Sequence, residues 1–163
     1  DGFVTRVLGD AAARVTTTEI SYVMRHRLSQ RGYRVLDGRY WPENDPKKYD
    51  IITCLNVLDR HTTPLQLLRN MVEKLYRGGL LVLALVLPYH PYVEYESRSH
   101  EPQERLELEG LTLEEQVTSL ITRVLPQLGL QVQSWTKLPY FCEGDLEQTY
   151  YWLQDVVLVA KKL

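Results

Sequence analysis

Residues 47–68, KKYDIITCLNVLDRHTTPLQLL, contain the junction that decides the fold. Tyr49 to Leu55 is largely apolar and partly β-branched, which predicts a buried strand. Polar side chains follow at 56 and 59–61, and Thr63-Pro64 is typical of a helix start, with Thr63 as the cap. Polar groups where a strand stops are common at active sites and also in solvent-exposed loops. The sequence on either side of this stretch helps to distinguish an active site from a solvent-exposed loop.

The flanking sequence predicts alternating helices and strands. Apolar spacing indicates helices near 3–12, 21–32, 64–77 and 114–128. Runs of β-branched or apolar residues indicate strands near 14–19, 33–36, 49–55, 80–87, 130–138 and 150–161. We expect Ser21 to cap the second helix and Gly78-Gly79 to end the third. The apolar run Leu80–Leu87 suits a strand buried on both faces. The alternation predicts a doubly wound, Rossmann-like α/β sheet, and the last two strands, with no helix between them, predict an antiparallel pair at one edge.

Composition predicts one ordinary globular domain over residues 1–163, with 44% hydrophobic and 25% charged residues. The net charge of −2 gives no electrostatic reason to expect nucleic acid as a partner. No apolar run in this chain is long enough for a transmembrane segment. Cys54 and Cys142 form no Cys-x-x-Cys pair, which favours free thiols in a reducing, intracellular compartment. The four histidines show no metal-ligand spacing, and no hydrolase or phosphate-loop motif is present.

Glu19 closes the second predicted element, a strand. In open α/β sheets ligands bind beyond the carboxyl ends of the strands, and an acid there can accept hydrogen bonds from the ribose hydroxyls of a nucleotide-like cofactor. The alternative is a solvated glutamate that the dipole of the following helix favours.

Asn56 and Asp59 follow the strand of the opening stretch. The carboxamide both donates and accepts hydrogen bonds, whereas the ionised carboxylate only accepts them. If the turn begins helically, the two side chains can face one pocket and orient a neutral nucleophile that must lose a proton. The alternative is that Asp59 pairs with Arg60 or caps the following helix.

Tyr150 and Tyr151 are adjacent on the last predicted strand and must point to opposite faces, so one of them can reach a pocket at the sheet edge. Packing is the alternative for both. His90, in the tyrosine-rich segment from Pro88 to Tyr95, is a candidate for substrate contact, and a surface loop stabilised by aromatic packing is the alternative.

Several long phrases resemble one family. The phrases are YDIITCLNVLDR (49–60), LALVLPYHPYVE (83–94), EEQVTSL (114–120), LPYFCEGD (138–145) and YYWLQDVVLVAKK (150–162). They resemble the DREV-type methyltransferases, which are class I S-adenosylmethionine-dependent enzymes. The resemblance covers the chain from its first residue to its last.

This resemblance implies a protein-L-histidine N-pros-methyltransferase. Such an enzyme moves a methyl group from S-adenosylmethionine to the pros nitrogen of histidine in His-x-His motifs of proteins. It implies that Glu19 holds the cofactor ribose and that Asp1 and Gly2 are the tail of a glycine-rich cofactor loop. It places Asn56 and Asp59 beside the methyl donor and the substrate imidazole, with Tyr151 completing the catalytic pocket. Tyr150 and His90 are, apart from this resemblance, our candidates for substrate contact.

The front of the chain departs from the family pattern. The first strand and most of the glycine loop would precede Asp1, so we expect a fragment whose sheet has a gap between the strands ending at Glu19 and Leu55. Two alternatives stay open: a non-catalytic scaffold with a methyltransferase fold, and a methyltransferase for another acceptor.

Overall fold

The computed structural model describes residues 2–93, 97–144 and 148–163. It divides into two compact units, Asp1–Pro46 and Lys47–Leu163, and each is described here by itself. Asp1, expected to bind the cofactor, lies outside the described residues. The expectation of one domain over residues 1–163 stays a prediction.

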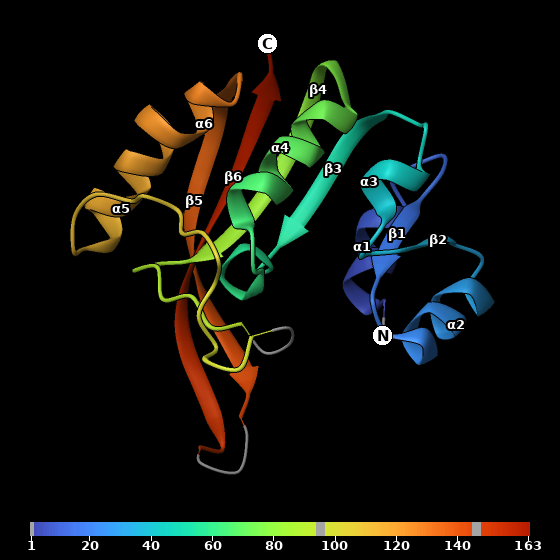
Figure 1. The fold of residues 1–163 in the computed structure, drawn as a ribbon, viewed down its shortest axis with the longest axis horizontal. Coiled ribbons are helices and arrows are strands. Elements are labelled where there is room, and N and C mark those ends of the chain that lie inside the picture. Colours follow the sequence, from blue (N-terminus) through green and yellow to red (C-terminus); the bar gives the residue numbers. More distant parts are fainter. Residues whose placement is uncertain (1, 94–96, 145–147) are drawn as a thin grey trace. The chain divides into compact units, whose positions relative to one another are not determined.

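The first unit contains a βαβ motif (Figure 1). Its elements are α1 (Phe3–Gly9), β1 (Thr16–Glu19), α2 (Tyr22–Gln30), β2 (Arg34–Asp37) and α3 (Trp41–Asn44). Ser21 caps α2 as the sequence predicts, because its Oγ accepts the Met24 N–H at 3.4 Å. β1 and β2 are parallel, with Glu19 opposite Asp37. The two carboxylates therefore lie at the same, carboxyl end of this sheet.

The second unit is a four-stranded sheet with the order β3-β4-β6-β5. Its elements are β3 (Tyr49–Leu55), η1 (Leu58–Arg60), α4 (Pro64–Lys74), β4 (Leu75–Val86), α5 (Leu113–Ser119), η2 (Leu120–Val124), α6 (Leu125–Gln127), β5 (Leu130–Glu143) and β6 (Tyr150–Lys162). β3 and β4 are parallel, and the other two pairs are antiparallel. The predicted C-terminal antiparallel pair is confirmed, with β5 at the edge. The described strands fall into two sheets, β1-β2 in the first unit and β3-β4-β6-β5 in the second.

The end of α4 differs from the expectation. The helix stops before Gly78-Gly79, which lie instead inside the stretch that forms β4. Lys162 of β6 bonds carbonyl groups at the end of α4. Its Nζ donates to the carbonyl oxygens of Val72 and Leu75 at 2.6 and 2.9 Å. A cation is favourable at a helix C-terminus. The end of α4 is thus stabilised by Lys162, which is distant in sequence, and not by the nearby Gly78-Gly79 pair as we expected.

The helix predicted over 114–128 is present in three segments. α5 passes into the π-helical turn η2 and then into α6, which contains Pro126. Proline has no N–H to donate to the preceding turn, so an α-helical hydrogen bond is missing there. A π turn next to such a position accommodates the lost bond without ending the helix.

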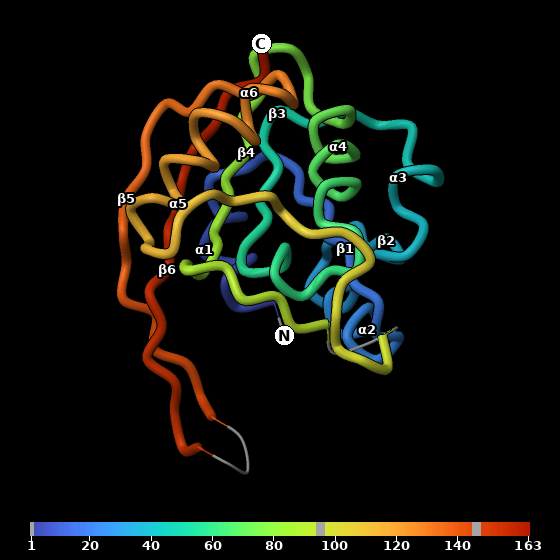
Figure 2. The backbone as a smooth tube through the Cα atoms, turned by 60° about the vertical axis from the view of Figure 1, so that its left-hand side comes forward, coloured from blue at the N-terminus to red at the C-terminus, as the bar shows by residue number. Residues whose placement is uncertain are grey.

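β4 shows where the core of the second unit lies. The leucines at 81, 83 and 85 are fully buried, whereas Leu80, Val82 and Val86 on the opposite face are half-buried. Figure 1 shows α4 and α5–α6 on one side of this sheet, and Figure 2 shows the same arrangement in a turned view. The run expected to be buried on both faces is thus fully buried beneath the helices, whereas on the opposite face Ala84 alone of the run is buried, with 3% exposure. Asp155 of β6 is paired with Val86, on the face away from them.

Candidate functional site

Asn56 leaves β3 in a left-handed backbone conformation, with φ of 54°. Asparagine adopts this region more readily than most residues. Its backbone N–H still donates to the Ala84 carbonyl oxygen at 3.0 Å, which continues the ladder with β4. Its Nδ2 donates to Asp155 Oδ2 at 2.9 Å, across 99 positions of sequence. Asn56 Oδ1 is buried and has no hydrogen-bond partner among the described residues.

Asp155 is a site residue that the sequence analysis missed. Its side chain is only 6% exposed, and burial raises its pKa. The Asn56 amide and the backbone N–H groups of Val156 and Leu85 oppose this effect by favouring the carboxylate. A carboxylate that directly precedes the apolar run Val156 to Ala160 of β6 is the signal that could have identified it.

Asp59 lies in η1, so the turn after β3 begins helically, which is the condition for Asn56 and Asp59 to face one pocket. Its carbonyl oxygen accepts the Tyr92 N–H at 2.8 Å, and its Oδ1 is buried. Burial, reinforced by the charge of Asp59, raises the pKa of the Cys54 thiol to about 12. Burial also raises the pKa of Tyr89 to about 12, with Asp59 a smaller contribution in the same direction. The carboxylate is therefore held in the interior of this turn and not in a solvated loop.

The start of α4 is capped differently from the expectation. Thr63 is the N-cap residue, but its side chain makes no capping hydrogen bond. Instead, His61 Nδ1 accepts the Thr63 N–H at 3.0 Å, and Glu104 Oε1 accepts the Gln66 N–H at 2.7 Å. The Gln103 N–H also donates to the Thr62 carbonyl oxygen at 2.8 Å. Gln103 and Glu104, in the segment after β4, therefore hydrogen-bond to the residues that directly follow the turn with Asp59.

Tyr151 and Tyr150 lie on opposite faces of β6. Tyr151 is half-buried and, by the alternation of the strand, shares its face with Asp155. Tyr150 is 53% exposed, and its ring centroid lies 5.1 Å from that of Phe141 on β5. His90 is exposed in the segment that follows β4. Of these three candidates, only Tyr151 lies on the face of the Asn56–Asp155 pair.

Glu19 is half-buried at the end of β1, in the first unit. Its Oε1 accepts the Ser21 N–H at 2.8 Å, which orients the carboxylate. Arg25 donates to the Glu19 carbonyl oxygen at 3.1 Å and forms an ion pair with Asp37 at 3.0 Å. A hydrogen bond from Arg39 and the charge of Arg25 hold the pKa of Asp37 well below its usual range. Glu19 is therefore an ordered carboxylate at a strand end and not a freely solvated one.

Gly2 precedes α1 in a left-handed conformation, with φ of 78°. A Cβ at this position would lie 2.6 Å from Leu28 Cδ2 of α2. The left-handed backbone conformation favours glycine here, and a larger residue would also push the Leu28 side chain aside.

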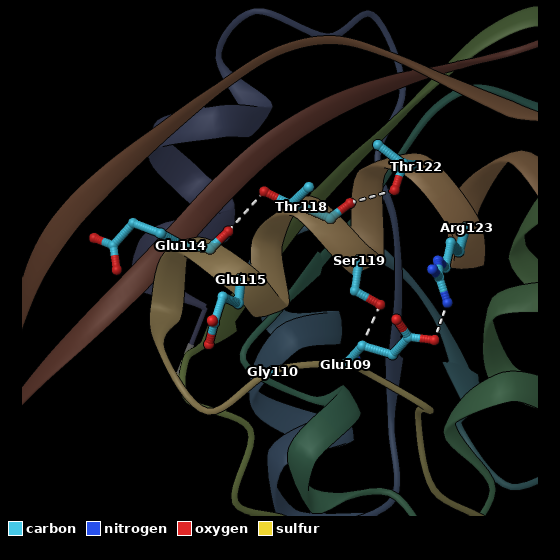
Figure 3. Close-up of a pocket in the computed structure, with 8 residues that line it drawn as sticks. All are labelled: Glu109, Gly110, Glu114, Glu115, Thr118, Ser119, Thr122 and Arg123. Carbon is cyan, nitrogen blue, oxygen red and sulfur yellow. Dashed lines mark hydrogen bonds and ion pairs between the residues drawn. The ribbon is translucent and has the colours of Figure 1, made fainter.

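A polar hollow on α5 lies apart from these candidates. Figure 3 shows it lined by Glu109, Gly110, Glu114, Glu115, Thr118, Ser119, Thr122 and Arg123. Its groups largely bond to one another: Arg123 pairs with Glu109, and Ser119 Oγ accepts the Glu109 N–H at 3.0 Å. None of the residues expected at the site lines this hollow.

In the described part of the chain, no group of three or more His, Cys, Asp or Glu side chains is placed to hold a metal ion. Every helix in the same ranges is too short or too polar to cross a bilayer.

Solved structures similar to this chain share a Rossmann-like methyltransferase fold. TehB from Haemophilus influenzae has a TM-score of 0.57 and 11% identity, with 98% of this chain and 53% of TehB covered. The N-methyltransferase NodS from Bradyrhizobium japonicum, in complex with S-adenosyl-L-homocysteine, has a TM-score of 0.59 and 16% identity, with 99% and 72% covered. An S-adenosylmethionine-dependent methyltransferase from Methanosarcina mazei has a TM-score of 0.59 and 13% identity, with 99% and 88% covered.

The predicted fold class is thereby confirmed: an α/β sheet of the methyltransferase type with antiparallel C-terminal strands. At this identity the likeness concerns the fold alone, and the chain spans about half the length of TehB. The family model described as DREV methyltransferase matches residues 1–162. The chain therefore belongs to the DREV methyltransferase family, as its sequence phrases indicate.

Proposed function

We propose that this chain carries the methyl-transfer site of a protein-L-histidine N-pros-methyltransferase, which modifies histidine in His-x-His motifs of proteins. The observation that carries the proposal is the DREV methyltransferase match over residues 1–162. The carboxamide and the carboxylate that follow β3 support it, because they suit a neutral nitrogen nucleophile that must lose a proton.

S-adenosylmethionine is the methyl donor, as the family and its structural neighbours indicate, and it supplies a sulfonium-activated methyl group. The residues present fit such a ligand. Asn56 Oδ1 is a buried acceptor with no partner among the described residues, and buried acceptors of this kind are normally satisfied. In this proposal Glu19 accepts the ribose hydroxyls. In this proposal Gly2 lies in the loop beside the cofactor, and Asp1, the other expected cofactor residue, is outside the described residues.

Asp59 has the role of orienting the substrate imidazole. Its carboxylate accepts the tele N–H, and the hydrogen bond at one ring nitrogen fixes the state of the other. The pros nitrogen then keeps its lone pair for attack on the methyl carbon. The negative charge of Asp59 also stabilises the imidazolium that forms. Methyl transfer further depends on placing the two reacting atoms in line, within roughly 3–3.5 Å.

The remaining candidates have smaller roles in this proposal. Tyr151 completes the pocket from β6, consistent with its place on the face of Asp155. Tyr150 and His90, both exposed, contact the substrate protein outside the pocket.

The test uses two peptides that differ only at the two histidine positions. The chain is incubated with isotope-labelled S-adenosylmethionine and a His-Ala-His peptide, and with a control peptide in which both histidines are glutamine. We expect label only in the histidine peptide, and mass spectrometry after hydrolysis should identify pros-methylhistidine. Tele-methylhistidine, or label in the control peptide, would point to another acceptor. Binding of S-adenosylhomocysteine without any transfer would favour the scaffold alternative.

A further inference from the structure

Asn56 is held from two directions. Its backbone N–H is bonded to Ala84 at 3.0 Å, and its left-handed φ of 54° takes the chain out of the strand direction at this residue. Its side chain is bonded to Asp155 at 2.9 Å on a different strand. The backbone bond comes from β4 and the side-chain bond from β6, so the residue has little freedom to turn.

The partner atom determines which way the carboxamide faces. In the structure the NH₂ group of Asn56 donates to Asp155 Oδ2 at 2.9 Å, so the NH₂ end of the carboxamide faces Asp155. The opposite end of the Asn56 side chain is then Oδ1. That oxygen is buried and has no hydrogen-bond partner among the described residues. A buried carbonyl oxygen without a donor is unusual in a folded protein and calls for an explanation.

We infer that Asp155 is a positioning residue: it fixes the Asn56 carboxamide so that Oδ1 accepts a hydrogen bond from an N–H group of the bound ligand. The donor belongs either to the cofactor or to the substrate, since both carry N–H groups. The identity of this ligand rests on the proposed function, whereas the coupling between Asp155 and Asn56 does not. The simpler alternative is that the Asn56–Asp155 pair only stabilises the sheet. Two experiments distinguish this structural role from a contact with the ligand.

The first test measures orientation without any activity. The chain has three asparagines, Asn44, Asn56 and Asn70, so their side-chain NH₂ signals can be assigned in a ¹⁵N-labelled sample. We expect one Asn56 NH₂ proton to be shifted downfield by its carboxylate acceptor in the unmodified chain. Asp155→Asn should remove that shift. Asp50→Asn, an exposed aspartate on β3, is the matched control and should leave the signal in place. An Asn56 signal that does not respond to Asp155→Asn overturns the inference.

The second test exchanges the two side chains. With Asp155→Asn alone, either end of the Asn56 carboxamide can face the new amide, so ligand binding should weaken about tenfold or more. Asn56→Asp alone places two carboxylates together and should be at least as damaging. The double exchange, Asn56→Asp with Asp155→Asn, restores a single amide-to-carboxylate bond and leaves a carboxylate oxygen in the place of Oδ1. We expect it to recover most of the lost binding.

Two ligands are measured so that the donor can be assigned. Weaker binding of S-adenosylhomocysteine in a calorimeter assigns the N–H to the cofactor. A higher KM for the His-Ala-His peptide, with S-adenosylhomocysteine affinity unchanged, assigns it to the substrate. Failure of the double exchange to improve on the single variants, or failure of the unmodified chain to bind either ligand, overturns the ligand contact. Intact binding and NMR coupling without methylation would overturn only the proposed acceptor.

Discussion

The surrounding structure restricts the side-chain orientation of Asn56 and buries part of the Asp59 carboxylate. Asn56 is locked by a bond to a carboxylate on β6, and Asp59 lies in the turn η1 with its Oδ1 buried. Cys54 and Tyr89, which both respond to Asp59, have pKa values of about 12, so both are neutral at physiological pH. In the proposed function Asp59 supplies the negative charge that balances the positive charge developing on an imidazole.

We expect Asp59→Ala to reduce turnover of the His-Ala-His peptide by about 100-fold, within the usual range for a group that assists proton transfer. Affinity for S-adenosylhomocysteine should hardly change, because the role of Asp59 concerns the substrate imidazole. Single-turnover kinetics and calorimetry measure the two quantities. Asp59→Asn keeps the shape and an acceptor oxygen but not the charge, and should retain more activity. Equal losses of turnover and cofactor affinity would contradict the assigned role.

The two long helical segments of the second unit are capped by different means. α5 has a local capping box, in which Thr112 Oγ1 accepts the Glu115 N–H at 3.2 Å and Glu115 accepts the Thr112 N–H at 3.0 Å. α4 relies on Glu104 at its start and Lys162 at its end, both distant in sequence. The start of α5 is therefore encoded locally, whereas α4 depends on the assembled fold.

Thr112→Ala should lower the free energy of unfolding by about 1 kcal/mol, which is typical for loss of a threonine N-cap. Urea denaturation followed by circular dichroism measures this change. Thr122→Ala is the matched control, because Thr122 is also exposed and its hydroxyl also bonds the backbone, donating to the Thr118 carbonyl oxygen at 2.8 Å. The control should stay within about 0.5 kcal/mol. Equal effects of both substitutions would show that the capping box contributes nothing specific.

The stability of the second unit depends on its central strands. β4 and β6 lie between β3 and β5, and their helix-covered face is lined by fully buried leucines. Leu158 of β6 is 1% exposed and is paired with Leu83 of β4. The same pair of strands places Asp155 against Asn56 on the other side. The packing that stabilises the sheet therefore also positions the candidate site.

Leu158→Ala should lower the free energy of unfolding by about 2–5 kcal/mol, because it removes a buried side chain and leaves a cavity. Leu111→Ala is the matched control: Leu111 is 89% exposed, and its truncation should change stability by less than about 0.5 kcal/mol. Denaturant titration of both variants gives the comparison. A loss below about 1 kcal/mol for Leu158→Ala would show that the sheet collapses around the gap without cost.

Local patterns were sufficient for most of the fold. Apolar spacing predicted every strand and the longer helices, and the absence of a helix between the last two strands predicted their antiparallel pairing. Errors occurred where a distant residue replaced a local signal, as when Lys162 and not Gly78-Gly79 satisfied the end of α4. The length of β5, which continues to Glu143, was also underestimated because pairing with β6 extends it.

The family and the carboxyl ends of β1 and β3 could be predicted from residues near one another in the chain, because strand periodicity and motif spacing are local properties. The hydrogen-bond partner of Asn56 could not be predicted in this way. Asp155 lies 99 positions away, and its contact depends on β6 inserting between β4 and β5. Strand order is set by the free energy of burying the whole sheet, which no short stretch contains. The local sequence shows only an asparagine at the end of a strand. The tertiary structure orients its side chain and buries Oδ1 as a hydrogen-bond acceptor.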